Sequence, residues 1–225
     1  MILRFKFIKY GPVVYIGHLD VMRYFQKVIR RSGIDASYTG GFSPHLKLSF
    51  AQPLSVGVET KGDYFDLEMN SLPDMNSIVS LMNQQCVEGL EITQVTVLPE
   101  NAVNGMSSVK AAKYIFEFED AFEADVKILE DFFSKETYEF DYVLKDKENH
   151  RDIMPDVYSN EIIDDSKLSV TVNCSSSGNL KPIVVCMALE NFGFKGVLKN
   201  IVRVDLYTDA DGALVPLGNI GEVYD

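Results

Sequence analysis

Hydrophobic residues in the first hundred positions change their spacing repeatedly, and this pattern constrains the fold more than any other feature. Residues 1–10 alternate strictly, with Leu3, Phe5 and Phe7 on one side, which predicts a strand with one buried face. Residues 18–33 repeat apolar side chains at helical spacing and end at a glycine. The predicted elements that follow are extended segments at 35–42 and 46–54, a strand at 62–69, a helix at 73–86 and a strand at 90–99.

This order, strand–helix–strand–strand–helix–strand, is that of the ferredoxin-like fold, an antiparallel sheet with helices packed on one face. After a small polar connection at 101–111, the order is predicted a second time. Its predicted elements are strands at 113–119, 138–145, 167–174 and 201–209, and helices at 122–135 and 181–193. We therefore predict an α+β protein of tandem ferredoxin-like domains, 1–100 and 111–225. The second domain includes a polar insertion at 145–166 and a loop-like tail at 210–225.

Charge is unevenly distributed along the chain, whose net charge is -12. Residues 1–50 contain eight Lys and Arg residues against two acids, a net charge of +6, and the remaining residues carry -18. Such asymmetry is typical of a protein that turns a basic face toward an anionic partner, while its acidic body limits indiscriminate nucleic-acid binding. The sequence leaves open the alternative that the basic segment pairs with the protein's own acidic surface.

A glycine-rich segment without a single acid, TGGFSPHLKLSFAQPLSVG, occupies residues 39–57, after the basic helix. Its paired glycines permit positive φ and close approach of a ligand, and exposed backbone N–H groups there favour an anion. His45 lies within this segment and His18 lies at the start of the basic helix, and the aromatic rings nearby offer stacking faces. We predict a binding site gathered at one end of the sheet from His18, Asp20, Arg23, Lys27, Arg30, Tyr38, Gly41, Phe42, Ser43, His45 and Lys47.

The same residues allow other interpretations. A basic helix face is often merely solvated, and aromatic residues at strand positions often belong to the core. His18 and His45 are candidates for the acid and base of metal-independent RNA cleavage, because imidazole titrates near neutral pH. The sequence contains no Walker loop, dinucleotide-binding glycine motif, iron–sulfur cysteine motif or catalytic-serine elbow. We therefore expect no cofactor and no metal, and assign no catalytic residue.

Four motifs together resemble a bacterial family of unknown function that is described as radical-SAM-linked. They are GHLD at 17–20, GFSPH at 41–45, SFAQPLSVG at 49–57 and GDYFD at 62–66, with weaker similarity at 151–155 and 181–189. The resemblance implies a radical-SAM protein as partner, and any radical chemistry would belong to that partner. The motif residues that it implies are His18, Asp20, Arg23, Arg30, Gly41, Phe42, Pro44, His45, Ser49, Phe50, Pro53, Gly57 and Asp66.

Three functions follow as hypotheses. The first is an accessory module that binds an anionic partner, most plausibly RNA, for a radical-SAM modification system. The second is a ferredoxin-like endoribonuclease that uses the two histidines, and the third is a docking module for the radical-SAM enzyme. No apolar run approaches the ~18 residues of a membrane helix, and the N-terminus lacks the apolar block of a signal peptide. We therefore expect a soluble cytoplasmic protein with no membrane partner.

Overall fold

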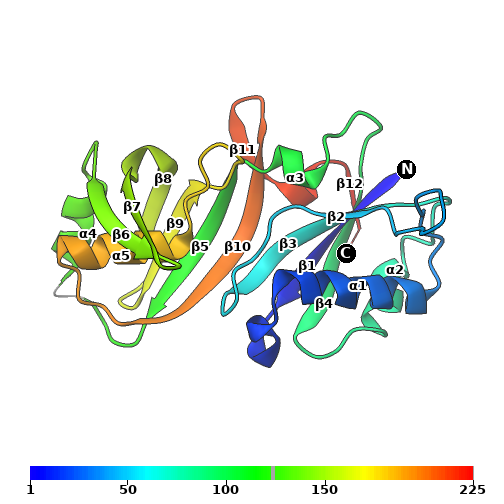
Figure 1. Ribbon diagram of the computed structural model, residues 1–225, viewed down its shortest axis with the longest axis horizontal. Coiled ribbons are helices and arrows are strands. Elements are labelled where there is room, and N and C mark those ends of the chain that lie inside the picture. The colour runs from blue at the N-terminus through cyan, green and yellow to red at the C-terminus, as the bar shows by residue number, and fades with distance from the viewer. Residues whose placement is uncertain (123–124, 225) are drawn as a thin grey trace. The chain divides into compact units, whose positions relative to one another are not determined.

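The computed structural model describes residues 1–122 and 125–224. The fold is mixed α+β, with extensive antiparallel sheet and a few helices (Figure 1). The chain forms two compact units, Met1–Lys110 together with Arg203–Asp225, and Ala111–Val202. Strand β10 (Leu198–Ala210) contributes residues to both units.

The first unit follows the predicted order of strands and helices. Its elements are β1 (Ile2–Lys9), the 3-10 helix η1 (Gly11–Tyr15), α1 (His18–Ser32), β2 (Leu48–Phe50), β3 (Glu59–Glu68), α2 (Ile78–Asn83), β4 (Leu90–Val97), α3 (Gly105–Ser108), the second part of β10, β11 (Ala213–Pro216), the 3-10 helix η4 (Leu217–Asn219) and β12 (Glu222–Tyr224). The predicted helix at 73–86 is shorter than expected. The segment at 35–42 forms isolated bridges, Ala36 with Met69 and Tyr38 with Leu46.

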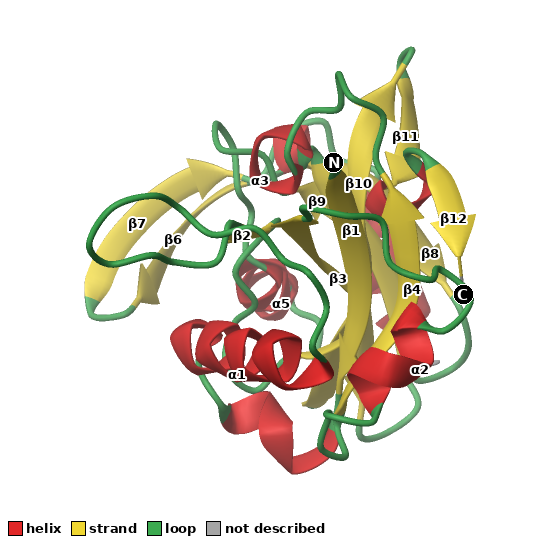
Figure 2. Ribbon diagram, turned by 90° about the vertical axis from the view of Figure 1, so that its right-hand side faces the viewer, coloured by secondary structure: helices red, strands yellow, loops and turns green. Residues whose placement is uncertain are grey.

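The central strands of this unit lie in the order β4–β1–β3–β2, each antiparallel to its neighbour. Helix α1 connects β1 to β2, and α2 connects β3 to β4. Both helices pack on the same face of the sheet, where they share one hydrophobic core with it (Figure 2). Strand β12 extends the sheet beyond β4, and β10 lies along the edge of β3 that β2 also uses.

The alternation of β1 correctly predicts which of its faces is buried. Leu3, Phe5 and Phe7 are at most 2% exposed and pack into the core that α1 covers. The rings of Phe5 and Phe65 stack with their centroids 5.0 Å apart. Burial of each such side chain contributes about 1.5–3 kcal/mol to folding. Helix α1 ends where predicted, at Gly33, whose φ of 72° is left-handed.

The opposite face of β1 and β3 holds a buried ion pair. Arg4 is 1% exposed, and its Nε and Nη2 donate to the two carboxylate oxygens of Asp66 at 2.7 and 2.9 Å. Asp66 also accepts a hydrogen bond from the backbone N–H of Gly105 at 2.7 Å, and Arg4 donates to the carbonyl of Leu217 at 3.2 Å. The pair thus ties the central strands to α3 and to the C-terminal segment.

The second unit repeats the same strand order in different elements. They are β5 (Ala111–Phe118), α4 (Val126–Phe133), β6 (Glu139–Leu144), β7 (Lys147–Asp152), the 3-10 helix η3 (Met154–Asp156), β8 (Val157–Ile162), β9 (Lys167–Asn173), α5 (Pro182–Phe192) and the first part of β10. Within the described residues, the predicted helix at 122–135 corresponds to α4. Residues 123–124 lie outside the described residues. The strand order is β10–β5–β9–β8.

The strand predicted at 138–145 forms, but not in the predicted place. It is β6, which pairs with β7 in a separate two-stranded sheet. The position beside β9 belongs to β8, which comes from the segment predicted as an insertion. Five of the six residues of β8 are exposed, so no hydrophobic alternation marks β8 as the strand that joins the main sheet.

The C-terminal segment differs from the predicted second-domain strand and loop-like tail. Residues from Arg203 onward belong to the first unit. Asp205 accepts a hydrogen bond from the Tyr64 hydroxyl at 2.5 Å, and Leu217 is fully buried. Thr96 donates to the carbonyl of Gly218 at 2.6 Å. These polar contacts to β3 and β4 draw the segment back to the first unit, and it forms β11, η4 and β12. Residue 225 lies outside the described residues.

Replacing Asp66 with asparagine should strongly destabilise the first unit. The substitution keeps the shape but leaves the buried Arg4 guanidinium without its counter-charge, which costs about 3–5 kcal/mol. The free energy of unfolding, measured in urea, tests this expectation.

Glu68→Gln provides a matched control on the same strand. Glu68 pairs with Lys47 at 2.7 Å, but both side chains are 40% exposed. Such a surface pair contributes about 0–1 kcal/mol. Equal losses of stability in Asp66→Asn and Glu68→Gln would contradict the role given to the buried pair.

Candidate functional site

Helix α1 divides its residues between a core face and a basic outer face. Val21, Phe25, Val28 and Ile29 are buried against the sheet. The outer face carries the predicted cations at helical spacing, and all of them are exposed: Arg23, Lys27, Arg30 and Arg31. The two arginines of the last turn also complement the negative end of the helix dipole.

Most of the eight cations in residues 1–50 have partners in the first unit. Arg4 pairs with Asp66, Lys6 with Asp205 at 2.7 Å, Arg23 with Asp20 at 3.2 Å, and Lys47 with Glu68 at 2.7 Å. Lys9 is buried and donates to the carbonyl of Val14 at 3.3 Å. For these residues the alternative of pairing within the protein is correct.

Three cations on α1 remain, and their charge is available to a partner. Within residues 1–122 and 125–224, Lys27, Arg30 and Arg31 make no ion pair. The pair between Arg23 and Asp20 is exposed and therefore weak, so Arg23 can also exchange its partner. The outer face of α1 is thus a basic stripe, defined by Arg23, Lys27, Arg30 and Arg31.

The glycine-rich segment after α1 folds into a narrow exposed loop. The backbone N–H of Thr39 donates to the His45 carbonyl at 2.8 Å, and the N–H of His45 donates to the Thr39 hydroxyl at 3.0 Å. Leu46 is buried and anchors the loop. Gly41 has a φ of 100°, a conformation that explains the glycine. We call residues 38–47 the glycine loop.

Aromatic rings stand exposed on this loop. Phe42 is fully exposed, and Tyr38 is 44% exposed. The side chains of Ser43 and His45 are exposed as well. An isolated exposed aromatic ring is common on protein surfaces, but here it stands on a loop tip closed by paired backbone and hydroxyl hydrogen bonds. The loop therefore presents a ring face, a hydroxyl and an imidazole on a defined backbone.

The structure does not bring His18 and His45 together. The ring of His18 contacts the ring of Phe50 edge-on, with the centroids 5.4 Å apart, and lines a small cavity with Asp63, in the middle of β3. The glycine loop is hydrogen-bonded to the C-terminal end of β3. There the backbone N–H of Glu68 donates to the carbonyl of Lys47. Five residues of strand separate these two places, about 17 Å. The predicted gathering around one end of the sheet is therefore wrong for His18, and so is the predicted acid–base pair.

His18 is also unsuited to contact a phosphate through a positive charge. Burial lowers the pKa of His18, with Arg203 and Lys9 adding to the decrease and Asp63 opposing it. A histidine with a pKa below its usual value of about 6.5 is neutral at pH 7. His18 is therefore not a phosphate-contacting cation at neutral pH.

A buried polar cluster beneath His18 escaped the sequence analysis. Arg203 donates to Asp63 at 2.6 Å and to the carbonyl of Pro53 at 3.1 Å, and Lys9 lies nearby. Burial raises the pKa of Asp63 and lowers that of Lys9. The cavity has a volume of only about 10 Å³, room for one water at most. The cluster holds the SFAQPLSVG segment in place; it offers no room for a larger ligand.

One signal for this cluster was present in the sequence. Lys9 has the same parity along β1 as Leu3, Phe5 and Phe7, so the alternation places it on the buried face. A charged residue at a buried position requires a partner. The sequence does not say that Lys9 would lie beside Asp63, or that Asp63 would pair with an arginine more than a hundred residues away.

The described residues contain no group of three or more side chains suited to hold a metal ion. Within the same ranges, no helix is long and apolar enough to span a membrane.

Solved structures of similar shape are distant. A chain of the crystal structure of a Cbf5–Nop10–Gar1 complex aligns with a TM-score of 0.46 and 11% identity, covering 92% of this chain and 51% of that one. A chain of an H/ACA RNP bound to a substrate RNA containing 2'-deoxyuridine aligns with a TM-score of 0.41 and 13% identity, covering 88% and 46%. The chain thus spans about half the length of these two chains, and TM-scores below 0.5 do not establish a shared fold.

No curated protein matches the chain in sequence. A family model does match, over residues 3–182, and this range includes the basic stripe, the glycine loop and most of the second unit. The chain therefore belongs to the family described as "Uncharacterized protein conserved in bacteria (DUF2344)".

Proposed function

We propose that this protein is a recognition module that binds single-stranded RNA with the basic stripe of α1 and the glycine loop. The observation that carries the proposal is the set of three cations without ion pairs, Lys27, Arg30 and Arg31, on one exposed helix face of a chain whose net charge is -12. In an acidic protein, nearby carboxylates are available to neutralise surface cations. Cations left on one face without such partners are suited to an anionic ligand.

The geometry of the stripe suits a phosphate backbone. Arg23 and Arg31 lie eight residues apart in α1, which spans about 12 Å along the helix axis. Lysine and arginine side chains distributed over that length can contact two or three successive phosphates. Binding of this kind releases counterions and weakens as salt is added.

The glycine loop offers contacts to the bases, which phosphate contacts do not provide. The exposed rings of Phe42 and Tyr38 offer faces on which unpaired bases can stack. Bases inside a duplex are already stacked on each other, so this chemistry favours single-stranded RNA, loops or ends. His45 and Ser43 add hydrogen-bonding groups beside the rings.

The proposal includes two finer points. Each unit is a ferredoxin-like module, an inference supported by the strand orders β4–β1–β3–β2 and β10–β5–β9–β8 with their connecting helices. The module serves a radical-SAM protein as partner, an inference that rests on the resemblance of the GHLD, GFSPH, SFAQPLSVG and GDYFD motifs alone. Any radical chemistry belongs to that partner.

Removing the three cations that lack ion pairs should weaken RNA binding and its dependence on salt. We expect the triple variant Lys27→Ala, Arg30→Ala, Arg31→Ala to bind a labelled single-stranded RNA of about 12 nucleotides roughly tenfold less tightly. The slope of log K against log salt concentration should fall by about 2, since each single-strand phosphate contact contributes about 0.7. Fluorescence anisotropy at several salt concentrations measures both quantities.

A second triple variant controls for net charge. Lys127, Lys195 and Lys199 are exposed in the second unit, and their replacement by alanine changes the charge of the protein by the same amount. Equal losses of affinity in the two triple variants would mean that the total charge, rather than the basic stripe, governs binding.

Replacing Phe42 with alanine separates binding from stability. The side chain is fully exposed, so the free energy of unfolding should change by no more than about 0.5 kcal/mol. Loss of one stacked base should weaken RNA binding by about 1–3 kcal/mol, roughly 5- to 150-fold. Phe42→Tyr keeps the ring and should keep the affinity; unchanged RNA binding in Phe42→Ala would remove the loop from the interface.

The partner is testable by co-purification from a bacterium that encodes the protein. We expect a radical-SAM protein to remain bound to the tagged chain after nuclease treatment, because a protein–protein contact does not depend on RNA. Mass spectrometry of the retained proteins identifies it. Loss of that protein upon nuclease treatment would make RNA the bridge, and its absence before treatment would refute the partnership.

A further inference from the structure

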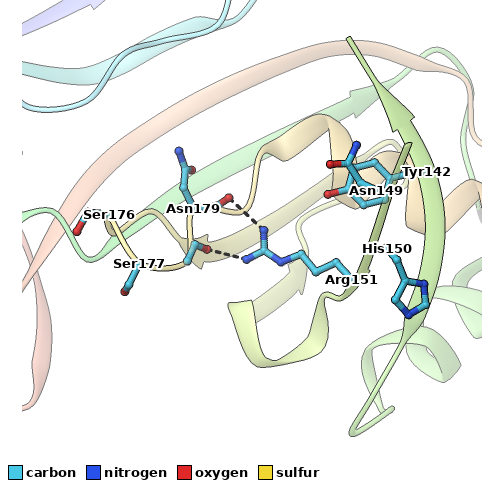
Figure 3. Close-up of a pocket in the computed structure, with 8 residues that line it drawn as sticks. Tyr142, Asn149, His150, Arg151, Ser176, Ser177 and Asn179 are labelled. Atoms are coloured by element: carbon cyan, nitrogen blue, oxygen red, sulfur yellow. Dashed lines mark hydrogen bonds between the residues drawn. The ribbon is translucent and has the colours of Figure 1, made fainter. Parts of the chain in front are cut away.

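The second unit contains a polar groove that the proposed function does not use. It has a volume of about 520 Å³ and lies between the β6–β7 hairpin and the loop that connects β9 to α5 (Figure 3). Pockets of about 300–1,000 Å³ commonly hold small ligands. Its lining residues are Tyr142, Asn149, His150, Arg151, Ser176, Ser177, Gly178 and Asn179.

Arg151 fixes one wall of this groove. Its guanidinium donates to the carbonyls of Gly178 and Asn179 at 2.9 and 3.2 Å (Figure 3). It also pairs with Asp156. Asp156 in turn accepts a hydrogen bond from the Asn173 amide at 2.8 Å. The loop is therefore held to the hairpin before any ligand arrives, and such preorganisation lowers the entropic cost of binding.

The close packing of this loop requires its glycine. A Cβ atom at Gly178 would collide with the side chains of Asn173 and Asp156. Asn173 also accepts from the N–H and the hydroxyl of Ser175, at 2.9 and 2.7 Å. These contacts shape the serine-rich turn into a wall of defined form.

The cations that line the groove lie beside carboxylates, so the net charge there does not favour an anion. The charge of Arg151 is balanced by Asp156. The imidazole of His150 contacts Asp141 at 2.8 Å, and the hydrogen bond to this carboxylate raises the pKa of His150. The remaining lining side chains are neutral and polar, apart from the ring of Tyr142.

The groups that remain available combine a flat ring with amides and hydroxyls. Tyr142 is half-buried and is backed by the ring of Phe140, with centroids 5.0 Å apart and planes 24° from parallel. Asn149 uses its Nδ2 to donate to the Lys147 carbonyl, which leaves its Oδ1 as an acceptor. Within the described residues, the side-chain amide of Asn179 and the hydroxyl of Ser176 make no hydrogen bond.

We propose that this groove binds one unpaired nucleobase, stacked on Tyr142 and hydrogen-bonded at its edge by asparagine. A base has a flat face for the ring and several donors and acceptors along its edge, which an amide can contact in pairs. A sugar offers hydroxyls but no flat face, and a phosphate would meet cations that already lie beside carboxylates. The site is separate from the basic stripe, and free nucleosides test it without that surface.

A tryptophan at position 142 reports on this site alone. The chain contains no tryptophan, so Tyr142→Trp introduces a single indole whose fluorescence a stacked base quenches. Titration with adenosine and with cytidine should give saturable quenching with a Kd in about the millimolar range. Asn179→Ala in this background should weaken binding by about 2- to 12-fold, the loss of one hydrogen bond.

Tyr158→Trp is the matched control. Tyr158 lies on β8, is 46% exposed and does not line the groove. Nucleosides should therefore quench the indole fluorescence of Tyr158→Trp in proportion to their concentration, without saturation. Ribose should leave the fluorescence of both variants unchanged. Quenching of Tyr142→Trp that matches the Tyr158→Trp control, or that ribose also produces, would overturn the proposal.

If Tyr142→Trp distorts the hairpin, saturation-transfer NMR on the unaltered protein tests whether a base stacks on Tyr142. Base protons of adenosine should receive more saturation than its ribose protons, and Tyr142→Ala should abolish the signal. Equal transfer to base and ribose would refute stacking. Nucleoside binding that survives in the triple variant of α1 would separate this site from the basic stripe, whichever of the two proposals fails.

Discussion

The first unit depends on two carboxylates of β3 that are buried on opposite faces of its sheet. Asp63 points to the face covered by α1 and binds Arg203, and Asp66 points to the other face and binds Arg4. A buried carboxylate without a counter-charge costs several kcal/mol, so each arginine must be present for the unit to be stable. Because Arg203 arrives after the whole second unit has been connected, the first unit cannot be completed from residues 1–110 alone.

This requirement also explains where the basic residues of the N-terminal segment are used. Arg4 and Lys9 stabilise the interior, and Lys6 reaches Asp205 of the returning strand. Some of the basic residues that make the sequence asymmetric in charge therefore hold the C-terminal segment in the first unit. What remains for a partner is the outer face of α1, where the helix keeps Lys27 and Arg30 away from those carboxylates.

The sequence predicted those parts of the fold that local pattern determines. The alternation of Leu3, Phe5 and Phe7 correctly predicted the buried face of β1, and Gly33 the end of α1. The candidate residues Arg23, Lys27, Arg30, Tyr38 and Phe42 are exposed as a binding surface requires. Their role in binding stays a prediction, because exposure alone does not identify a ligand.

The parts that the sequence did not predict depend on contacts between distant residues. The residues near Asp63 in sequence do not indicate that Arg203 is its partner. The residues near Glu139 likewise do not show that β6 pairs with β7 outside the main sheet. The separation of His18 from His45 has the same origin, because it depends on which part of β3 each segment contacts. The groove at Tyr142 needs Arg151 to meet the carbonyl of Gly178, a contact across 27 residues.

The two proposed sites are chemically complementary. The stripe is an exposed face of α1 that carries charge, so on the first proposal it holds a phosphate backbone in place without reading its bases. The groove of the second unit has a pocket whose charges are already balanced, so it can select a base while contributing little long-range attraction. Phosphate contacts position a nucleic acid, and base contacts discriminate between sequences. The two proposals together expect that substitution at Asn149 or Asn179 would change the preference for particular bases, while the affinity for the backbone, which on the first proposal depends on the α1 cations, would stay the same.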